Sequence, residues 1–387
     1  MRMSGKIPQR PNISLYFHIP FCTHKCHYCH FYVIPDKAFY KTQLMEGLAL
    51  EWQQRLPQMQ NTQIESIYFG GGTPSLLGAE RIAHILDTVK AALPFGAEPP
   101  EITLEANPEN ISTELMQSYA QAGINRVSIG VQTLDPPLLQ MLSRQHTAHK
   151  AIDAVISTAQ AGIGNISIDL MYDLPGQTLQ SWQSTLERAC TLPIAHLSLY
   201  NLTIEPHTPF YIRREALQKL MPDSDTSAQM HVMAIDTLLG HGWEHYEISA
   251  FSKNGCISRH NVGYWTARPF LGFGPSAFSY WEGARFQNCS NLSKYLRALK
   301  VQKSPVDFTE ELPLHAHQRE LLAIQLRLRA GVDMTAFQQT HGPLESEVLQ
   351  SIQGLIHSEL LESSANSILR LTRRGMLLYD TVAVELI

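Results

Sequence analysis

The sequence predicts an α/β protein: a partial (β/α)6 barrel followed by a mostly helical, winged-helix-like unit. Short β-branched runs alternate with amphipathic helical stretches, which is the pattern of βα units around a parallel sheet. Glycines stand at the ends of the helical stretches, and the alternation fades near residue 205. Six units over roughly 230 residues suit a barrel or partial barrel better than a small open sheet, with a Rossmann-like sheet as the structural alternative.

The predicted strands are short apolar runs bounded by polar or turn residues. They cover residues 14–19, 66–69, 101–105, 126–131, 165–170 and 196–202. Amphipathic stretches at 79–92 and 113–122 predict helices between them. Gly123 and Gly162 each follow a helical pattern within the sequence AGI, where a glycine in the left-handed conformation typically ends a helix.

The rest of the chain has a different pattern. Prolines mark a looser connection after residue 205, a Gly- and aromatic-rich segment spans 264–281, and helical stretches follow Pro305. These predicted elements are helices at 226–239, 319–329, 344–355 and 374–385 and a strand at 367–371. We expect a barrel core over 1–240, a connecting segment over 241–304 and a helical, winged-helix-like domain over 305–387.

Composition restricts the function classes. The chain has 387 residues, 44% of them apolar and 17% charged, which excludes a charge-rich disordered protein. Its formal net charge is −5, so we expect no nucleic-acid partner. Winged-helix modules often bind DNA, but with this charge we expect a docking or capping role for the C-terminal unit. The N-terminal segment lacks the apolar stretch of a signal peptide, and no run approaches ~18 apolar residues, so a cytoplasmic protein is expected.

Three cysteines fall close together in the spacing C-x3-C-x2-C: Cys22, Cys26 and Cys29. Three thiolates on one tight loop can hold three irons of a [4Fe–4S] cubane and leave the fourth iron open to a small molecule. A structural zinc site needs four closed ligands, and a nearby histidine could supply the fourth. A zinc-binding structural protein is therefore an alternative at this point.

Further polar or small residues stand where predicted strands end. The sequence GGGTP at 70–74 follows the second strand, and glycines there let the backbone approach a ligand, with a plain tight turn as the alternative. Glu105, Gln132 and Asp169 stand at three further strand ends, and barrel enzymes place their chemistry at that edge. Arg144 could supply a cation to a carboxylate. We expect one shared pocket.

Together these motifs resemble the radical S-adenosylmethionine (SAM) superfamily, in which SAM chelates the open iron of the cluster. Within it, the chain is similar to the oxygen-independent coproporphyrinogen III oxidases and their HemW-type heme-chaperone relatives. The matching stretches are YFHIPFC, GGGTPSLL, EANPE, RVSIGVQ, SRQHT and DLMYDLPGQT. The resemblance implies that Cys22, Cys26 and Cys29 hold the cluster and that SAM contacts Tyr16, Tyr28, Gly71, Gly72, Thr73, Glu105, Gln132, Arg144 and Asp169.

Three features favour the chaperone branch over the oxidases. The oxidases carry a fourth cysteine where this chain has Phe31, and they have a longer extension before the cluster motif than the 21 residues here. The chaperones carry an HNxxYW motif, which matches His260, Asn261, Tyr264 and Trp265. The resemblance implies a heme site at this motif, with imidazole as iron ligand and the aromatic rings against the porphyrin. Cys256 is a further candidate for heme contact.

The resemblance implies three bound groups, namely a [4Fe–4S] cluster, SAM and heme. It also implies a hemoprotein that accepts the heme, by family analogy a respiratory one at the membrane. A homodimer is a further expectation. No catalytic residue is assigned. Coproporphyrinogen III oxidation stays the alternative activity. The chain departs from the family at His27 and His30, where Pro and Asp are common around the last cysteine, and at Asp173, where Gly or His is usual.

Overall fold

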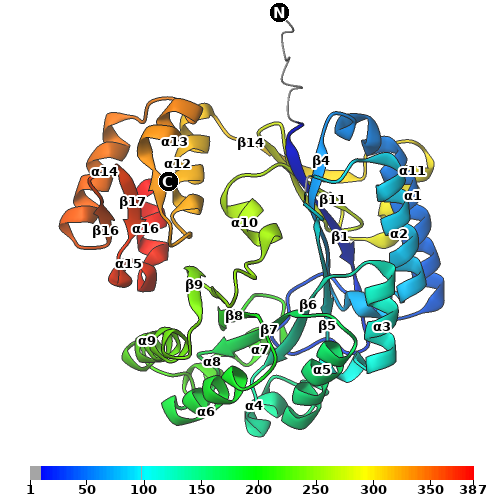
Figure 1. Cartoon of the computed structure of the whole chain (residues 1–387), viewed down its shortest axis with the longest axis horizontal. Helices are drawn as coiled ribbons and strands as arrows, with labels where there is room; N and C mark the ends of the chain where they lie inside the picture. The colour runs from blue at the N-terminus through cyan, green and yellow to red at the C-terminus, as the bar shows by residue number, and fades with distance from the viewer. Residues whose placement is uncertain (1–9, 97) are drawn as a thin grey trace, which may run out of the picture.

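The computed structural model describes residues 10–96 and 98–387, so the expectations about the first nine residues lie outside the described part. A curved sheet with helices on its outer side forms most of the molecule, and the C-terminal unit stands across from it (Figure 1). Within the described residues, no helix is both long and apolar enough to cross a membrane.

The main sheet has twelve strands in the described part of the chain, in the order β14-β13-β12-β11-β1-β4-β5-β6-β7-β8-β10-β9. Its middle is parallel and consists of the strands of the six predicted βα units. These are β1 (Asn12–Ile19), β4 (Gln63–Gly71), β5 (Glu101–Ala106), β6 (Arg126–Gln132), β7 (Asn165–Tyr172) and β8 (His196–Asn201).

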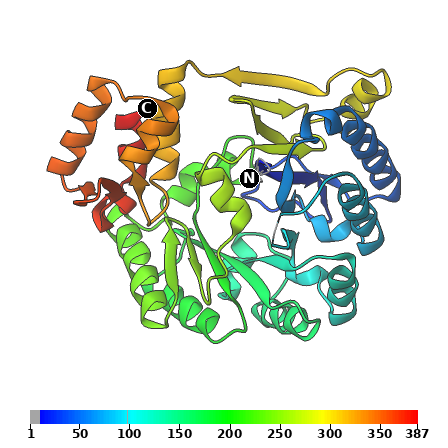
Figure 2. The ribbon, with the colours of Figure 1, turned by 45° about the horizontal axis from the view of Figure 1, so that its top comes forward.

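Helices cover the convex side of this parallel region (Figures 1 and 2). They are α1 (Ala38–Met59), α2 (Ala79–Ala92), α3 (Thr113–Ala122), α4 (Pro136–Met141), α5 (Ala148–Gln160), α6 (Leu179–Cys190), α9 (Ser224–Gly240) and α11 (Leu292–Lys300). The helices predicted at 79–92 and 113–122 are confirmed at both ends. Gly123 and Gly162 have the expected positive φ, +110° and +89°.

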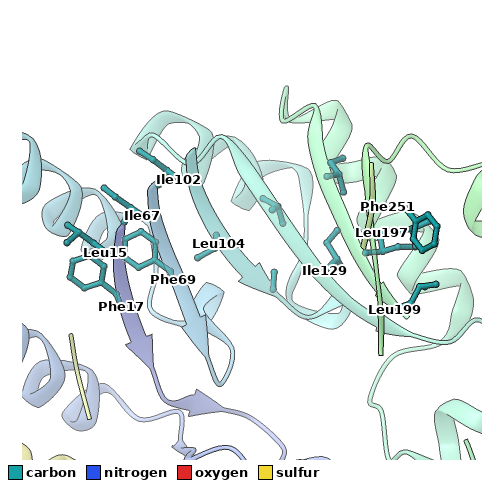
Figure 3. Packing of buried hydrophobic residues seen from close by; sticks show 14 of the residues in the cluster. Leu15, Phe17, Ile67, Phe69, Ile102, Leu104, Ile129, Leu197, Leu199 and Phe251 are labelled. Carbon is teal, nitrogen blue, oxygen red and sulfur yellow. The ribbon is translucent and has the colours of Figure 1, made fainter. Parts of the chain in front are cut away.

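Alternation along the strands separates two environments. Leu15, Phe17, Ile67 and Phe69 belong to the set that points toward the helices and forms one continuous core across the sheet (Figure 3). Because successive strand residues face opposite sides, Tyr16 and its neighbours in the other register face the concave interior. That interior is polar: it carries tyrosines, carboxylates, serines and histidines from successive strands. The concave side is therefore the place for a site.

Antiparallel strands extend the sheet at both edges. One edge has β9 (Glu244–Glu247) and β10 (Ala250–Ser252), and the other has β11 (Phe270–Phe273), β12 (Phe278–Trp281), β13 (Ala284–Asn288) and β14 (Val306–Glu311). Of these, β11 pairs parallel with β1. The segment expected as a connection over 241–304 thus contributes strands to both edges, and the sheet continues to residue 311 before the C-terminal unit begins.

The C-terminal unit has the helix-and-strand order of a winged helix. Its elements are α12 (Leu314–Gln325), β15 (Val332–Asp333), α13 (Met334–His341), α14 (Ser346–His357), β16 (Leu361–Ser363), β17 (Ile368–Leu371), α15 (Arg373–Leu377) and α16 (Tyr379–Leu386). The three strands pair antiparallel in the order β15-β17-β16. The single helix expected over 374–385 is two helices, because Leu378 leaves the helical conformation with φ −112° and ψ 30°.

Shorter elements connect these parts. They are β2 (Phe21–Cys22), β3 (Ile34–Pro35), the 3-10 helices η1 (Pro74–Leu76) and η2 (Pro108–Asn110), α7 (Pro209–Ile212), α8 (Arg214–Gln218) and α10 (Arg259–Trp265). Helix α10 lies inside the curve of the sheet, between β4 and α12 (Figures 1 and 2). It carries the HNxxYW motif into the concave interior.

Candidate functional site

The three cysteines lie on a loop at the carboxyl end of β1. The two-residue strands β2 and β3 pair in parallel and tie the two ends of this loop together, so residues 22–33, here called the cysteine loop, project from a fixed base. The backbone N–H of Cys29 donates to the carbonyl of Cys26 at 3.2 Å, which makes a tight turn between the last two thiols. Tyr28 packs against Phe210, with ring centroids 6.4 Å apart.

All three thiols are free and partly buried. Cys22 Sγ lies 3.5 Å from the hydroxyl of Thr73, and Arg144 donates to Cys26 Sγ at 3.5 Å. Burial, with a smaller effect of the neighbouring Cys29 and Cys26 thiols, raises the pKa of the Cys22 thiol to about 11. Burial likewise raises the pKa of Cys29. The thiols therefore lie close enough to influence one another, and a nearby positive charge would favour their deprotonation.

The glycine run after β4 is packed against the cysteine loop and β1. A Cβ on Gly71, which has φ +114°, would lie 2.6 Å from the imidazole of His18, and one on Gly72 would lie 2.6 Å from the carbonyl oxygen of Phe21. These glycines are therefore required by the packing itself, apart from any ligand. The N–H of Gly71 donates to a carboxylate oxygen of Glu105 at 3.2 Å.

Two carboxyls from neighbouring units face the interior. Tyr68 donates to Glu105 at 2.8 Å, and Ser128 donates to Asp169 at 3.2 Å. Burial raises the pKa of Glu105 to about 7 and that of Asp169 to about 6. The buried Arg126 guanidinium opposes both shifts. Two carboxyls held near their ionisation point can accept hydrogen bonds or a cation at little cost.

Arg144 is the centre of a hydrogen-bonded group beside the cysteine loop. It donates to Asn107 at 2.8 Å and to the carbonyl of Gly130 at 2.6 Å, in addition to Cys26. Asn107 also donates to the hydroxyl of Thr73 at 2.9 Å. The buried Nε of Arg144 has no hydrogen-bond partner among the described residues. Gln132 ends β6 with φ +67°, so the strand breaks where this group begins.

The structure therefore brings the predicted strand-end residues to one edge. It also adds two residues without a predicted role, Tyr68 in the second predicted strand and Asn107 in the stretch EANPE. Tyr68 lies on the concave face and holds Glu105, and Asn107 links Thr73 to Arg144. The alternation of the second strand could have placed Tyr68 in the site, because residues two apart in a strand share a face and Gly70 of the glycine run follows two positions later.

The HNxxYW motif lies on α10, and its histidine is buried. One ring nitrogen of His260 shares a hydrogen bond with the hydroxyl of Ser66 at 2.9 Å, and the other shares one with the hydroxyl of Tyr264 at 2.8 Å. Its backbone N–H donates to Glu101 at 2.9 Å. Burial lowers the pKa of His260 to about 3. Both ring nitrogens are thus engaged within the protein, which leaves neither free for iron in this arrangement.

The other members of the motif lie nearer to open space. Tyr264 and Trp265 line a large cavity, and the indole N–H of Trp265 is buried with no acceptor among the described residues. The Trp265 ring faces the guanidinium of Arg327 at 4.3 Å, which fixes the indole against the C-terminal unit. Asn261 lies in the first turn of the helix, and its backbone N–H donates to the hydroxyl of Ser258, the N-cap residue, at 3.4 Å. Cys256 precedes the helix and is not part of the described cavity wall.

The cavity has a volume of about 860 Å³ and lies between the cysteine loop, α10, β12, β13 and α12. Its wall is rich in aromatic side chains, including Phe31, Tyr264, Trp265, Phe270, Phe278 and Tyr280. Three cationic side chains also line it, Lys25, Arg268 and Arg285, together with one carboxylate, Glu320. A large apolar pocket with a few charged groups suits a flat, mostly apolar ligand that carries anionic substituents.

Comparison with known proteins identifies the relatives of this chain. The model of the radical SAM superfamily matches residues 16–189, and that of the HemN C-terminal domain matches residues 312–378. A protein of Lactococcus lactis called heme chaperone HemW is 34% identical over 97% of both chains. Its namesake from Bacillus subtilis is 32% identical over 95% of this chain and 97% of its own.

The chain belongs to the HemW family of radical SAM proteins. The solved structure of coproporphyrinogen III oxidase (HemN) from Escherichia coli, described as a radical SAM enzyme, superposes with a TM-score of 0.85 over 98% of this chain and 90% of its own, at 23% identity. This likeness confirms the predicted α/β class and the helical C-terminal region. The predicted resemblance to the HemW branch is confirmed by the sequence relatives.

Membership of the radical SAM superfamily implies a [4Fe–4S] cluster and SAM, and the residues of this site fit both. Three free thiols stand on one loop, with the Arg144 cation beside one of them to offset thiolate charge. The partnerless Nε of Arg144 is a buried donor that a bound anionic group can satisfy. Among the described residues, no three His, Cys, Asp or Glu side chains converge on a point that could hold a single metal ion.

Proposed function

We propose that this protein is a heme chaperone, which binds heme in the 860 Å³ cavity and transfers it to an acceptor hemoprotein. The observation that carries the proposal is the composition of the cavity wall, where the cysteine loop meets the two aromatic residues of the HNxxYW motif. The name heme chaperone, carried by relatives that match nearly the whole chain, supports the same assignment.

The chemistry of the wall suits heme. Aromatic faces pack well against a porphyrin, and the volume falls within the range of about 300–1,000 Å³ that is usual for sites of large ligands. Arg268 and Arg285 can pair with the two propionates, because guanidinium groups bind carboxylates through two parallel hydrogen bonds. Arg285 already pairs with Glu310 at 2.5 Å and with Glu320, so heme carboxylates would compete with those partners.

In this proposal the cluster and SAM occupy the neighbouring edge of the sheet. Cys22, Cys26 and Cys29 hold three irons. SAM contacts the nine residues that the resemblance implies, namely Tyr16, Tyr28, Gly71, Gly72, Thr73, Glu105, Gln132, Arg144 and Asp169. The cluster with SAM supplies one-electron and radical chemistry when bound. The protein's own part is to hold Glu105 and Asp169 partly protonated and to place Arg144 beside Cys26. A membrane-bound acceptor and a homodimer stay predictions of the resemblance.

His260 has a positioning role in this proposal. Its hydrogen bond to the hydroxyl of Tyr264 orients that ring, and its bond to Ser66 ties α10 to β4. The motif would then act through Tyr264 and Trp265, which line the cavity, and not through a bond from His260 to iron.

The test fills the cavity without removing a polar group. Ile324 on α12 lines the cavity, so Ile324→Trp should weaken heme binding by about tenfold or more in a heme titration of the anaerobically reconstituted protein. Leu349→Trp, on the exposed side of α14, is the matched control and should bind heme as the wild type does. Equal heme affinity in both variants and wild type would place heme elsewhere.

Two assays test the alternative functions. Anaerobic incubation with reductant, SAM and coproporphyrinogen III should give no turnover, and catalytic formation of protoporphyrinogen would establish the oxidase activity instead. Metal analysis should find iron and acid-labile sulfide near four of each per chain after reconstitution. Zinc without sulfide in the anaerobically purified protein would support the structural zinc alternative.

A further inference from the structure

The geometry points to His30, on the cysteine loop, as an axial ligand of the heme iron. This inference rests on the proposed heme binding in the cavity and names the residue that would bind the iron there. His30 directly follows Cys29, the last cysteine of the C-x3-C-x2-C motif.

His30 is exposed to the cavity, and its ring nitrogens have no hydrogen-bond partner among the described residues. It is exposed, it lines the cavity, and its ring stands against Phe31 with centroids 4.7 Å apart. Neither ring nitrogen makes a hydrogen bond or ion pair with any described residue. Neutral imidazole nitrogen is the commonest protein ligand of heme iron, and it needs a free lone pair to bind.

The other histidine of the cavity wall is not available. His18 is buried, and one of its ring nitrogens shares a hydrogen bond with the hydroxyl of Tyr16 at 3.1 Å while the other contacts the carbonyl of Tyr32 at 3.3 Å. Its ring also lies within 2.6–2.9 Å of the position a Cβ on Gly71 would take, so it is packed tightly against the glycine run. Iron binding would break both hydrogen bonds.

The other side chains of the wall that could bind iron, four tyrosines and one lysine, are not free to do so either. Its four tyrosines each share their hydroxyl with another protein group, and burial raises the pKa of each: Tyr16, Tyr32, Tyr264 and Tyr280. A phenol with a raised pKa is a poor source of the phenolate that iron binds. Lys25 carries an exposed ammonium, which must lose its proton before it can bind metal. The wall contains no cysteine or methionine within the described residues.

The experiment compares two histidines of the same loop. His30→Gly removes the proposed ligand, and His24→Ala removes an exposed histidine that is absent from the cavity wall and shares a hydrogen bond with Ser143. Ferric heme is titrated into each anaerobically reconstituted protein at equal iron and sulfide content, and absorption and EPR spectra are recorded. Added imidazole then tests whether the missing ligand can be replaced from solution.

We expect His30→Gly to lose the imidazole signature of the heme spectra, to bind heme about tenfold or more weakly, and to recover the signature when imidazole is added. His24→Ala should match the wild type. Wild-type spectra and affinity in His30→Gly would overturn the assignment of His30 while leaving heme binding intact. Failure of the wild-type protein to bind heme would instead remove the proposed function.

Discussion

Substitution of His260 distinguishes a positioning residue from an iron ligand. In the structure its ring makes two hydrogen bonds, to Ser66 and Tyr264, and packs against the ring of Tyr68 at a centroid distance of 4.8 Å. His260→Ala would leave two buried hydroxyls without that partner, at about 1–3 kcal/mol each, and would open a cavity. We therefore expect the free energy of unfolding to fall by about 3 kcal/mol or more, before any heme is added.

The assay is urea unfolding of the heme-free protein, followed by circular dichroism under one set of anaerobic conditions. His149→Ala is the control, because that side chain is 86% exposed on α5, and its change should stay within about 0.5 kcal/mol. His260→Gln can donate and accept hydrogen bonds and should recover part of the loss. If His260→Ala were as stable as His149→Ala yet lost the iron ligand signature, the residue would be an iron ligand and the reasoning here would be refuted.

Three further substitutions test the interior of the barrel. Glu105→Gln removes a carboxyl whose pKa burial raises to about 7, so the wild type is fully stabilised by this group only below about pH 4.5 and loses that stabilisation as the pH rises through about 7. The free energy of unfolding of the variant should therefore exceed that of the wild type by up to about 3 kcal/mol more at pH 8 than at pH 4.5. A difference in urea unfolding that does not change with pH contradicts this. Gly71→Ala forces an L side chain to φ +114° against His18 and should cost about 2 kcal/mol or more; an unchanged Tm would be inconsistent with that contact. Glu51→Gln leaves the buried Arg55, now paired at 2.8 Å, without its counter-charge and should cost about 3 kcal/mol in the same unfolding assay, whereas a neutral effect would mean that the pair is solvated.

The local patterns of the sequence predicted much of the barrel. The apolar alternation gave the six parallel strands, and the stretches at 79–92 and 113–122 gave two helices with their ends, because these patterns reflect a face that each element must bury. Helix α1 was not among the predicted elements. Its buried face carries Glu51 and Arg55, which interrupt the apolar pattern, and only their pairing with each other and with Asn288 of a distant strand explains that burial.

The sequence likewise predicted one part of the candidate site, and the tertiary structure decided the other. The sequence by itself determined the three thiols on one loop and the carboxyls at strand ends, since parallel strands bring their carboxyl ends to one edge whatever the rest of the chain does. Only the tertiary structure decided that His260 is buried between Ser66 and Tyr264, and that the cysteine loop, α10 and α12 enclose one cavity. The contact between His260 and Ser66 joins residues 194 positions apart, and no local spacing encodes the pairing of strands and helices that brings them together.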